Sequence, residues 1–132
     1  MNNNELVAMA AAMLDKAYVP YSKFPVGAAI LCEDGSVYSG CNIENAAYGP
    51  TICAERAALC RAICEGNHKI AKVAVVGETE DYCYPCGVCR QTLYEFNPNM
   101  KIICGRRDGN IVEHYLHELL PNAFGPLTLN DK

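Results

Sequence analysis

The sequence predicts a single α/β domain over residues 1–132, built on a mixed sheet of about five strands with helices packed on its faces. Two observations predict this class. Segments with apolar residues at helical spacing alternate with short apolar, partly β-branched runs that are typical of buried strands. The length suits one domain, and a composition of 51% hydrophobic and 20% charged residues is globular and neither disordered nor fibrous.

The first third of the chain predicts a helix followed by a β-hairpin. Residues 4–17 carry apolar positions at helical spacing, and a proline-bracketed loop follows at 20–25. An apolar strand is predicted at 26–32 and a second one at 37–41. The residues between them, Glu33-Asp34-Gly35-Ser36, have the acidic and glycine chemistry of a hairpin turn. The two strands are therefore expected to pair antiparallel.

The rest of the chain alternates helices with strands after a loop at 42–51. Helical spacing runs from residue 52 to about residue 64 and ends at Gly66-Asn67. The later predicted elements are a strand at 72–77, a helix at 86–96, strands at 101–104 and 111–115, and a short helical piece at 116–120. A strand, a helix and a second strand in this order are typical of a parallel crossover. The sheet is therefore expected to be mixed, with helices on both faces.

Charge and hydropathy exclude several classes of function. Eleven Lys and Arg stand against fifteen Asp and Glu, a net charge of −4, and no basic cluster is present to neutralise phosphates. Arg106-Arg107 comes closest, and Asp108 follows it at once, which is typical of a solvated turn. No apolar run approaches the ~18 residues of a membrane span, and Met1–Glu5 lacks the basic region of a signal peptide. We expect a cytoplasmic protein that binds neither nucleic acid nor a membrane.

The nine cysteines are the most unusual feature of the composition. An odd number cannot pair completely within one chain, and clustered cysteines in a reducing cytosol bind metal more often than they form disulfides. Cys86 and Cys89, two residues apart, begin the predicted helix 86–96 and can bind one zinc ion from its first turn. Cys53 offers a third thiolate at the start of another helix. Helix N-termini favour thiolates because their unpaired N–H groups carry partial positive charge.

The residues next to Cys53 indicate catalysis. Structural zinc nearly always has four protein ligands, whereas catalytic zinc keeps one position open for water. Glu55 lies on the same first helical turn as Cys53, where its carboxyl group can move a proton of that water. Three thiolates and one Zn²⁺ leave an excess negative charge that weakens a Lewis acid. We therefore expect Arg56 to offset it by hydrogen-bonding the ligand sulfurs.

Other sites stay open on the residues alone. Cys83, Cys86 and Cys89 match the beginning of an iron–sulfur run, but that run continues with Cys-Pro after three more residues, where this chain has Leu93-Tyr94. A closed zinc site would take Cys83, Cys60 or Cys64 as its fourth ligand. None of the three histidines is expected to be a ligand. The cysteines expected to be ordinary core residues are Cys32, Cys41, Cys60, Cys64 and Cys104.

At its cysteine motifs the sequence resembles the homotetrameric zinc-dependent cytidine deaminases, including members with three cysteine ligands. The resemblance covers nearly the whole chain. It includes the segments YSKFPVGAA at 21–29 and GCNIENAAYG at 40–49, which bind nucleoside in that family. It implies the three-layer fold of that family, a homotetramer, one zinc ion per subunit and Glu55 as the proton shuttle. The implied zinc ligands are Cys53, Cys86 and Cys89.

The resemblance also implies contacts with a nucleoside substrate. Asn42 and Glu44 bind the ribose hydroxyls, and Phe24 packs against the pyrimidine. Ala54 is a further implied substrate-binding residue, and Tyr48 and Phe124 are implied to reach the site of a neighbouring subunit. From the residues alone, an amide and a carboxylate suit a sugar diol, but Asn42 and Glu44 also suit loop capping. Phe24 likewise suits ordinary core packing.

The expected reaction is the hydrolytic deamination of cytidine and deoxycytidine, with water as the second reactant and ammonia as a product. One alternative is a deaminase for another aminopyrimidine nucleoside, such as a nucleoside antibiotic. The segment NIENA at 42–46 favours plain cytidine and deoxycytidine. The alternative from a different class is a non-catalytic binding module stabilised by zinc. An open coordination position and an essential Glu55 argue against such a module.

Overall fold

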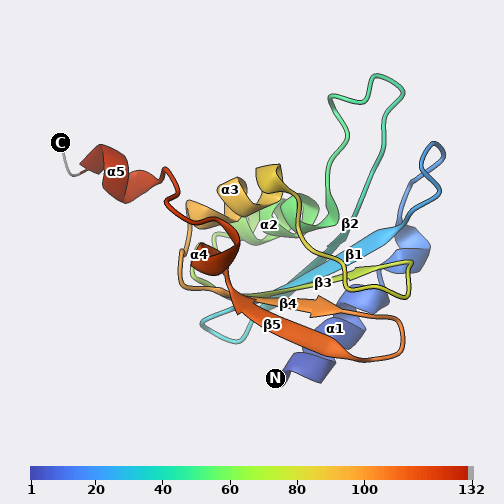
Figure 1. The fold of residues 1–132 in the computed structure, drawn as a ribbon, viewed down its shortest axis with the longest axis horizontal. Helices are drawn as coiled ribbons and strands as arrows, with labels where there is room; N and C mark the ends of the chain where they lie inside the picture. The colour runs from blue at the N-terminus through green and yellow to red at the C-terminus, as the bar shows by residue number, and fades with distance from the viewer. Residues whose placement is uncertain (131–132) are drawn as a thin grey trace.

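The computed structural model describes residues 1–130 and confirms the predicted α/β class. Figure 1 shows one five-stranded sheet in the order β2-β1-β3-β4-β5, with helices on both faces. The strands are β1 (Val26–Cys32), β2 (Val37–Cys41), β3 (Ile70–Gly77), β4 (Lys101–Gly105) and β5 (Ile111–Tyr115). The helices are α1 (Asn3–Ala11), α2 (Ala54–Cys64), α3 (Gly87–Tyr94), α4 (Leu116–Leu119) and α5 (Pro126–Asn130).

Strand pairing contains the predicted hairpin and the predicted parallel crossover, together with two pairings that the sequence did not predict. β1 and β2 form the antiparallel hairpin, and β1 also pairs antiparallel with β3. β3 and β4 are parallel, with Val75 opposite Cys104, and α3 is the crossover between them. β5 then returns antiparallel to β4. The sheet is mixed because hairpins flank a single parallel crossover.

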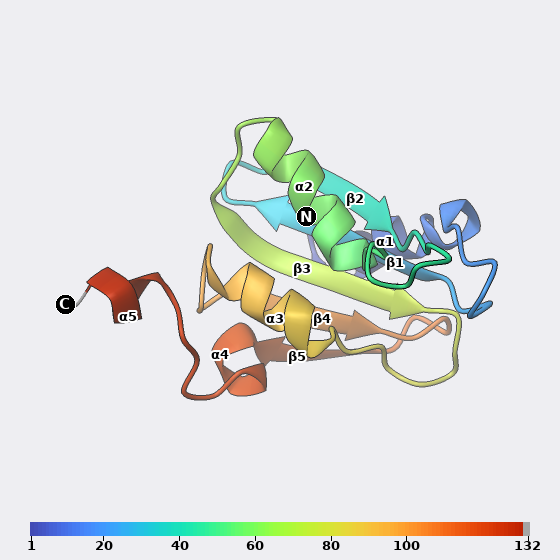
Figure 2. The ribbon, with the colours of Figure 1, turned by 90° about the horizontal axis from the view of Figure 1, so that it is seen from above.

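Two apolar cores lie on opposite faces of the sheet. Alternation along β3 places Val73 and Val75 in the core under α2 and α3, and Ala74 and Val76 in the core under α1. Figure 2 shows α2 lying over β2 and β1, and α3 lying over the neighbouring part of the sheet. The two helices therefore begin on the same face of the sheet.

Gly40 allows α2 to pack directly on β2. A Cβ atom at this position would lie 2.5 Å from the Ala58 backbone nitrogen and 2.8 Å from the Ala54 carbonyl oxygen. Such distances exclude any side chain, so the helix backbone rests on the strand backbone. This contact holds the first turn of α2, which contains Ala54 and Glu55, close to the sheet.

Several boundaries differ from the predicted ones. The helix predicted over 4–17 ends at Ala11 and is followed by a 3₁₀ turn at Leu14–Lys16, because i→i+3 hydrogen bonds tighten the chain there. The helix predicted from residue 52 begins at Ala54, since Ile52 pairs with Ile43 in an isolated β-bridge. α5 lies outside every predicted element.

The basic residues of the β4–β5 turn are paired with acidic neighbours. Arg106 Nη2 lies 2.7 Å from Asp108 Oδ2, and Arg107 forms an ion pair with Glu78. These pairs support the solvated turn predicted for this segment and leave no uncompensated basic patch there. Among residues 1–130, no helix has the length and apolar character needed to cross a membrane.

Candidate active site

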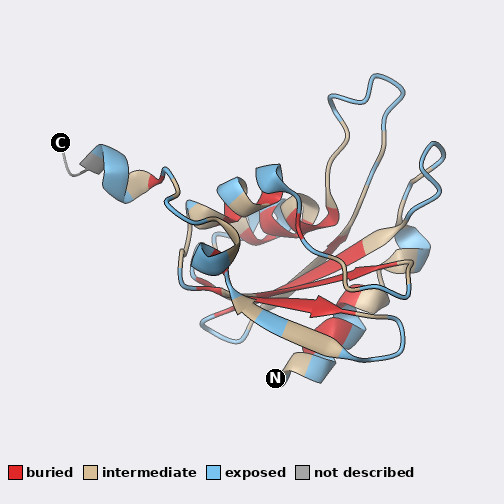
Figure 3. Ribbon diagram, in the orientation of Figure 1, coloured by how far each residue is buried: buried red, intermediate tan, exposed pale blue. Residues whose placement is uncertain are grey.

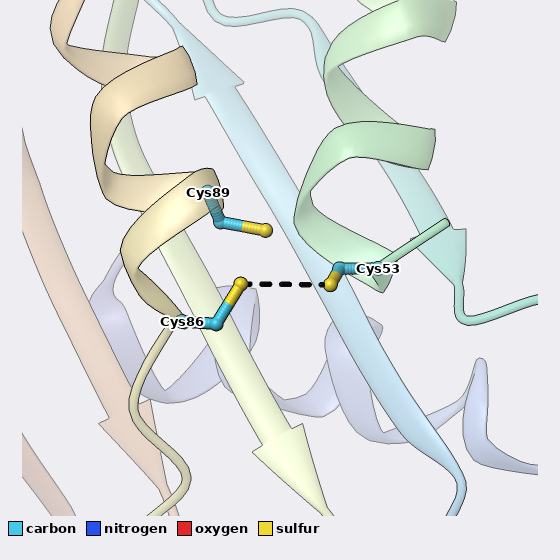
Figure 4. Close-up of side chains that lie close together, drawn as sticks. All are labelled: Cys53, Cys86 and Cys89. Atoms are coloured by element: carbon cyan, nitrogen blue, oxygen red, sulfur yellow. Dashed lines mark hydrogen bonds between the residues drawn. The ribbon is translucent and has the colours of Figure 1, made fainter. Parts of the chain in front are cut away.

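Three cysteines converge where α2 and α3 begin. Cys53 is the residue that caps α2, Cys86 caps α3, and Cys89 lies in the first turn of α3. Their sulfur atoms all lie within 4.8 Å of one another, and the Sγ atoms of Cys53 and Cys86 are 3.7 Å apart. Figure 4 shows the three side chains pointing toward one another from the two helix starts. The group that the sequence predicted is therefore assembled in the fold.

The geometry and chemistry of this group fit zinc. Zn–S bonds of about 2.3 Å in a tetrahedral site place two sulfur atoms about 3.8 Å apart. The 3.7 Å between Cys53 and Cys86 agrees with that separation. Among residues 1–130, no fourth Cys, His, Asp or Glu atom joins the group. Three protein ligands are the donor set of a catalytic zinc site and not of a closed structural one.

The other cysteines do not complete the site. Cys83 lies outside the three-sulfur group, so the structure supports neither an iron–sulfur cluster bound by Cys83, Cys86 and Cys89 nor a closed zinc site with Cys83 as its fourth ligand. Cys32 and Cys104 are buried, as expected, and Cys41 is half-buried. The expectation that Cys60 and Cys64 are core residues is wrong, because both are exposed. α2 buries the stripe that contains Ala58 and Ala62, and these two cysteines lie away from it.

Electrostatics favour an ionised thiol at Cys53. Its hydrogen bond with Cys89, together with the neighbouring Arg56, lowers the pKa of Cys53 to about 5. The same hydrogen bond and burial raise the pKa of Cys89, so in the absence of metal the shared proton stays on that side of the pair. Cys89 would give up this proton on binding zinc, because coordinating thiols are deprotonated.

Glu55 is the one buried charged residue among residues 1–130, with 3% of its surface exposed. It lies in the first turn of α2, two residues after Cys53. Burial raises the pKa of Glu55 to about 7, and the nearby Cys53 thiolate adds to this effect. A carboxyl group with a pKa near neutrality can both accept and release a proton at physiological pH.

Arg56 lies against the sulfur group. Its Nη2 atom donates to Cys53 Sγ at 3.6 Å and to the Thr51 carbonyl oxygen at 3.4 Å. The contact predicted from the sequence is thus present. A guanidinium at this distance reduces the excess negative charge of three thiolates around one Zn²⁺.

We expect Arg56→Ala to lower activity or zinc affinity by roughly 10- to 100-fold, the usual effect of losing a group that supports metal ligands. Arg61→Ala is the matched control, since Arg61 lies on the same helix and donates to the Ser39 carbonyl oxygen, away from the sulfur group. Chelator-competition titrations and initial rates measure the two effects. Equal and small changes in both variants would show that Arg56 is only a surface residue.

A cavity of about 230 Å³ opens next to the sulfur group. The predicted site residues that line it are Phe24, Asn42, Cys53, Ala54, Glu55 and Cys86. The remaining lining residues are Val26, Cys83 and Tyr84. For the site, the sequence analysis placed Val26 only within the segment 21–29, considered Cys83 only as an alternative metal ligand, and gave Tyr84 no role. The apolar pattern of 26–32 and the nearness of residues 83 and 84 to Cys86 were the available signals for them.

Asn42 supports the loop that carries Phe24. Its Oδ1 accepts from the Val26 backbone N–H at 2.9 Å, and its Nδ2 donates to the Phe24 carbonyl oxygen at 3.0 Å. The loop-capping role that the sequence allowed is therefore present. An amide carries two N–H donors and two acceptor lone pairs, so Asn42 retains one of each for a ligand.

Glu44 and Tyr48 line a second, neighbouring pocket of about 440 Å³, together with Tyr21, Ser22 and Thr51. Glu44 Oε1 accepts from the backbone N–H groups of Tyr21 and Ser22, each at 3.1 Å. Hydrogen bonding to Ser22 lowers the pKa of Glu44, so its carboxylate is ionised at neutral pH. Within one chain, the structure does not bring Glu44 and Tyr48 into the cavity of Glu55. Phe124 is 56% exposed and lines neither pocket.

Comparison with known proteins agrees with this geometry. Residues 1–106 match the family profile described as the cytidine and deoxycytidylate deaminase zinc-binding region. A cytidine deaminase of Sporosarcina psychrophila is 48% identical over 125 residues, which cover 94% of this chain and 92% of that protein. One of Halalkalibacterium halodurans is 47% identical over 132 residues, covering 99% of this chain and 100% of that protein.

The same relationship holds in three dimensions. The crystal structure of cytidine deaminase from Burkholderia pseudomallei matches with a TM-score of 0.90 and 43% identity, covering 94% of this chain and 100% of that one. The profile match over residues 1–106 includes both helix starts that carry the sulfur ligands. With the profile match and the three-cysteine group, it shows that this chain belongs to the zinc-dependent cytidine deaminase family.

Proposed function

We propose that the protein catalyses the hydrolytic deamination of cytidine and deoxycytidine, giving uridine and deoxyuridine with release of ammonia. One observation carries the proposal: a buried carboxyl group, Glu55, lies beside a three-thiolate zinc site in a cavity that Phe24 and Asn42 also line. Full-length relatives that are cytidine deaminases support the choice of substrate.

Cys53, Cys86 and Cys89 hold one zinc ion per chain, which supplies a Lewis acid for the activation of water. The charge of Arg56 keeps the trithiolate site electrophilic.

All nine cysteines are free of disulfide bonds in the structure. Free thiols persist in reducing compartments, so we place the reaction in the cytoplasm.

Glu55 carries the protons. Its carboxylate accepts a proton from the attacking water and delivers it to N3 of the pyrimidine, while the water oxygen bonds to C4. Glu55 then transfers the second proton of that oxygen to the exocyclic amino group. The C4–N4 bond breaks, ammonia leaves and the C4 carbonyl forms. A pKa near 7 suits both directions of transfer.

The nucleoside is oriented by residues that line this cavity and the neighbouring pocket of Glu44. Phe24 is 40% exposed as a residue and lines the cavity, and we assign its ring to contact with the pyrimidine. We assign the remaining hydrogen-bonding capacity of Asn42, and the carboxylate of Glu44, to the ribose hydroxyls. Ala54, which lines the cavity beside Glu55, contacts the ring.

Ultraviolet absorbance of the purified protein with cytidine, together with its zinc content, tests the proposal. We expect loss of the cytidine absorbance and formation of uridine. A protein that holds zinc but leaves cytidine unchanged would support the binding-module alternative. Faster turnover of another aminopyrimidine nucleoside than of cytidine would support the alternative deaminase.

The substrate is expected to be the free nucleoside and not a nucleotide or a base within a strand. The chain carries a net charge of −4, and Glu44 at the sugar would lie close to a 5′-phosphate. Like charges at a binding site cost several kcal/mol, so kcat/KM for cytidine monophosphate should be at least about 100-fold lower than kcat/KM for cytidine. A cytosine-rich single strand should react as poorly, since it requires a positive groove. Comparable kcat/KM values for cytidine and its monophosphate would contradict this role of Glu44.

We also propose a homotetramer. Large apolar side chains are exposed on the 42–51 loop and toward the C-terminal end. Figure 3 shows that much of the backbone in both segments belongs to exposed residues. They include Tyr48 (74% exposed), Phe124 (56%) and Leu127 (70%). Light scattering should give about four times the chain mass of 14.4 kDa. A monomer at micromolar concentration would contradict the tetramer and remove Tyr48 and Phe124 from any neighbouring site.

A further inference from the structure

Cys83 forms part of the cavity wall next to Phe24. Both side chains converge above Gly77, the last residue of β3. A Cβ atom at Gly77 would lie 3.1 Å from Phe24 Cζ and 3.2 Å from Cys83 Sγ. The absence of a side chain at residue 77 therefore lets the ring and the thiol settle against the end of the strand, and both line the cavity that Glu55 shares.

We propose that Cys83 sets the space at the C5 edge of the bound pyrimidine, and so determines which 5-substituted cytidines the enzyme accepts. This inference rests on the proposed deamination of cytidine. It concerns the choice among substrates and leaves the chemical roles of Glu55 and the zinc ligands unchanged.

The chemistry of deamination orients the pyrimidine ring in the cavity. C4 must face the three-sulfur group, and N3 must face Glu55, which accepts and delivers its proton. C5 is bonded to C4 on the side away from N3, so it points away from the start of α2. The segment that leads into α3 supplies Cys83, Tyr84 and Cys86 to the cavity, and the proposal places the C5 edge against this segment, at Cys83.

The Cys83 side chain suits an apolar ring edge. It is half-buried, and burial raises the pKa of its thiol to about 11, so it stays protonated. A protonated cysteine behaves as a small apolar residue. It is also smaller in volume than Val, Leu or an aromatic residue, so it leaves more room beside C5 than those side chains would.

Variants of Cys83 test the proposal through the ratio of kcat/KM for a 5-substituted cytidine to kcat/KM for cytidine. A loss of activity that affects all substrates equally cancels in this ratio. The substrates are cytidine, 5-methylcytidine and 5-iodocytidine. Cys83→Leu should lower kcat/KM for 5-methylcytidine relative to cytidine by roughly 10- to 200-fold, the range for a methylene-sized misfit in an apolar pocket. Cys83→Ala should raise the relative value for 5-iodocytidine. Cys60→Leu is the matched control, because Cys60 is exposed on α2 outside the cavity, and both ratios should stay at the parental value.

Binding supplies a second readout that does not depend on turnover. Calorimetric titration of the same three nucleosides into Cys83 variants that also carry Glu55→Gln should show the same shifts in the ratio of Kd values. Zinc content should be unchanged. If Cys83→Leu does not fold, Cys83→Val should lower the 5-methylcytidine ratio in the same direction.

The outcomes separate this inference from the proposed function. If the parent deaminates cytidine but all folded Cys83 variants keep the parental ratios, the role of Cys83 is refuted and the proposed function stands. If the parent neither binds nor deaminates cytidine, the proposed function fails and the role of Cys83 fails with it. Equal shifts in Cys60→Leu would also overturn the inference, since they would show an effect transmitted through the fold.

Discussion

Replacing Glu55 with Gln should abolish nearly all turnover of cytidine while the fold and the zinc content remain. The amide keeps the size and the helical position of the carboxyl group, but it cannot accept a proton. General acid–base groups typically contribute about 10²- to 10⁴-fold to the rate. Glu55 serves successive transfers to N3 and to the leaving amine, so we expect the upper end of that range or more. Initial rates from ultraviolet absorbance, with zinc analysis and circular dichroism, measure the effect.

Glu65→Gln is a suitable control for this variant. Glu65 is exposed at the C-terminal end of the same helix, so its change removes the same charge far from the sulfur group. It should retain parental activity. A Glu55→Gln enzyme within about tenfold of the parent would refute the proton-shuttle role, because the loss would lie below the usual range for a general acid–base group.

Replacing any one of Cys53, Cys86 and Cys89 with Ala should remove zinc and, with it, the activity. Two thiolates cannot hold the ion as three do, and each of these side chains supplies one sulfur of the group. Metal analysis of each purified variant should show a large drop from one zinc per chain. Cys89 is also buried, so its variant should lose thermal stability as well.

Cys60→Ala is the control, because this exposed cysteine lies outside the sulfur group. It should keep one zinc per chain and parental turnover. Iron in the parent protein, or two zinc ions per chain, would overturn the assignment of the site. Retention of zinc by Cys86→Ala would show that Cys86 is not a ligand.

Local pattern was sufficient for the class of fold and for most of its elements. Val26–Cys32, Val37–Cys41 and Ile111–Tyr115 are strands over the residues predicted from their apolar patterns. These strands could be predicted because alternation and turn chemistry are properties of neighbouring residues. The positions of the helix ends were predicted less accurately. The shortening of α1 depends on i→i+3 hydrogen bonds, and the start of α2 depends on a bridge between Ile52 and Ile43.

The metal-binding residues could likewise be predicted from the sequence. Cys86 and Cys89 have ligand spacing, and Cys53 and Glu55 share a helical turn, so the sequence indicated the metal donors and the proposed acid–base group together. Those inferences rest on residue type and short-range spacing, which do not depend on the rest of the fold.

Only the tertiary structure decided which side chains meet and which face water. The contact at Gly40 holds α2 against the sheet, and the crossover from β3 places the start of α3 beside it, which brings Cys53 within 3.7 Å of Cys86. The same packing buries Glu55 and leaves Cys60 and Cys64 exposed, although all three lie on one helix. It also seats Cys83 against Phe24. Burial and long-range contact arise from how whole elements pack, and spacing along the chain carries no measure of either.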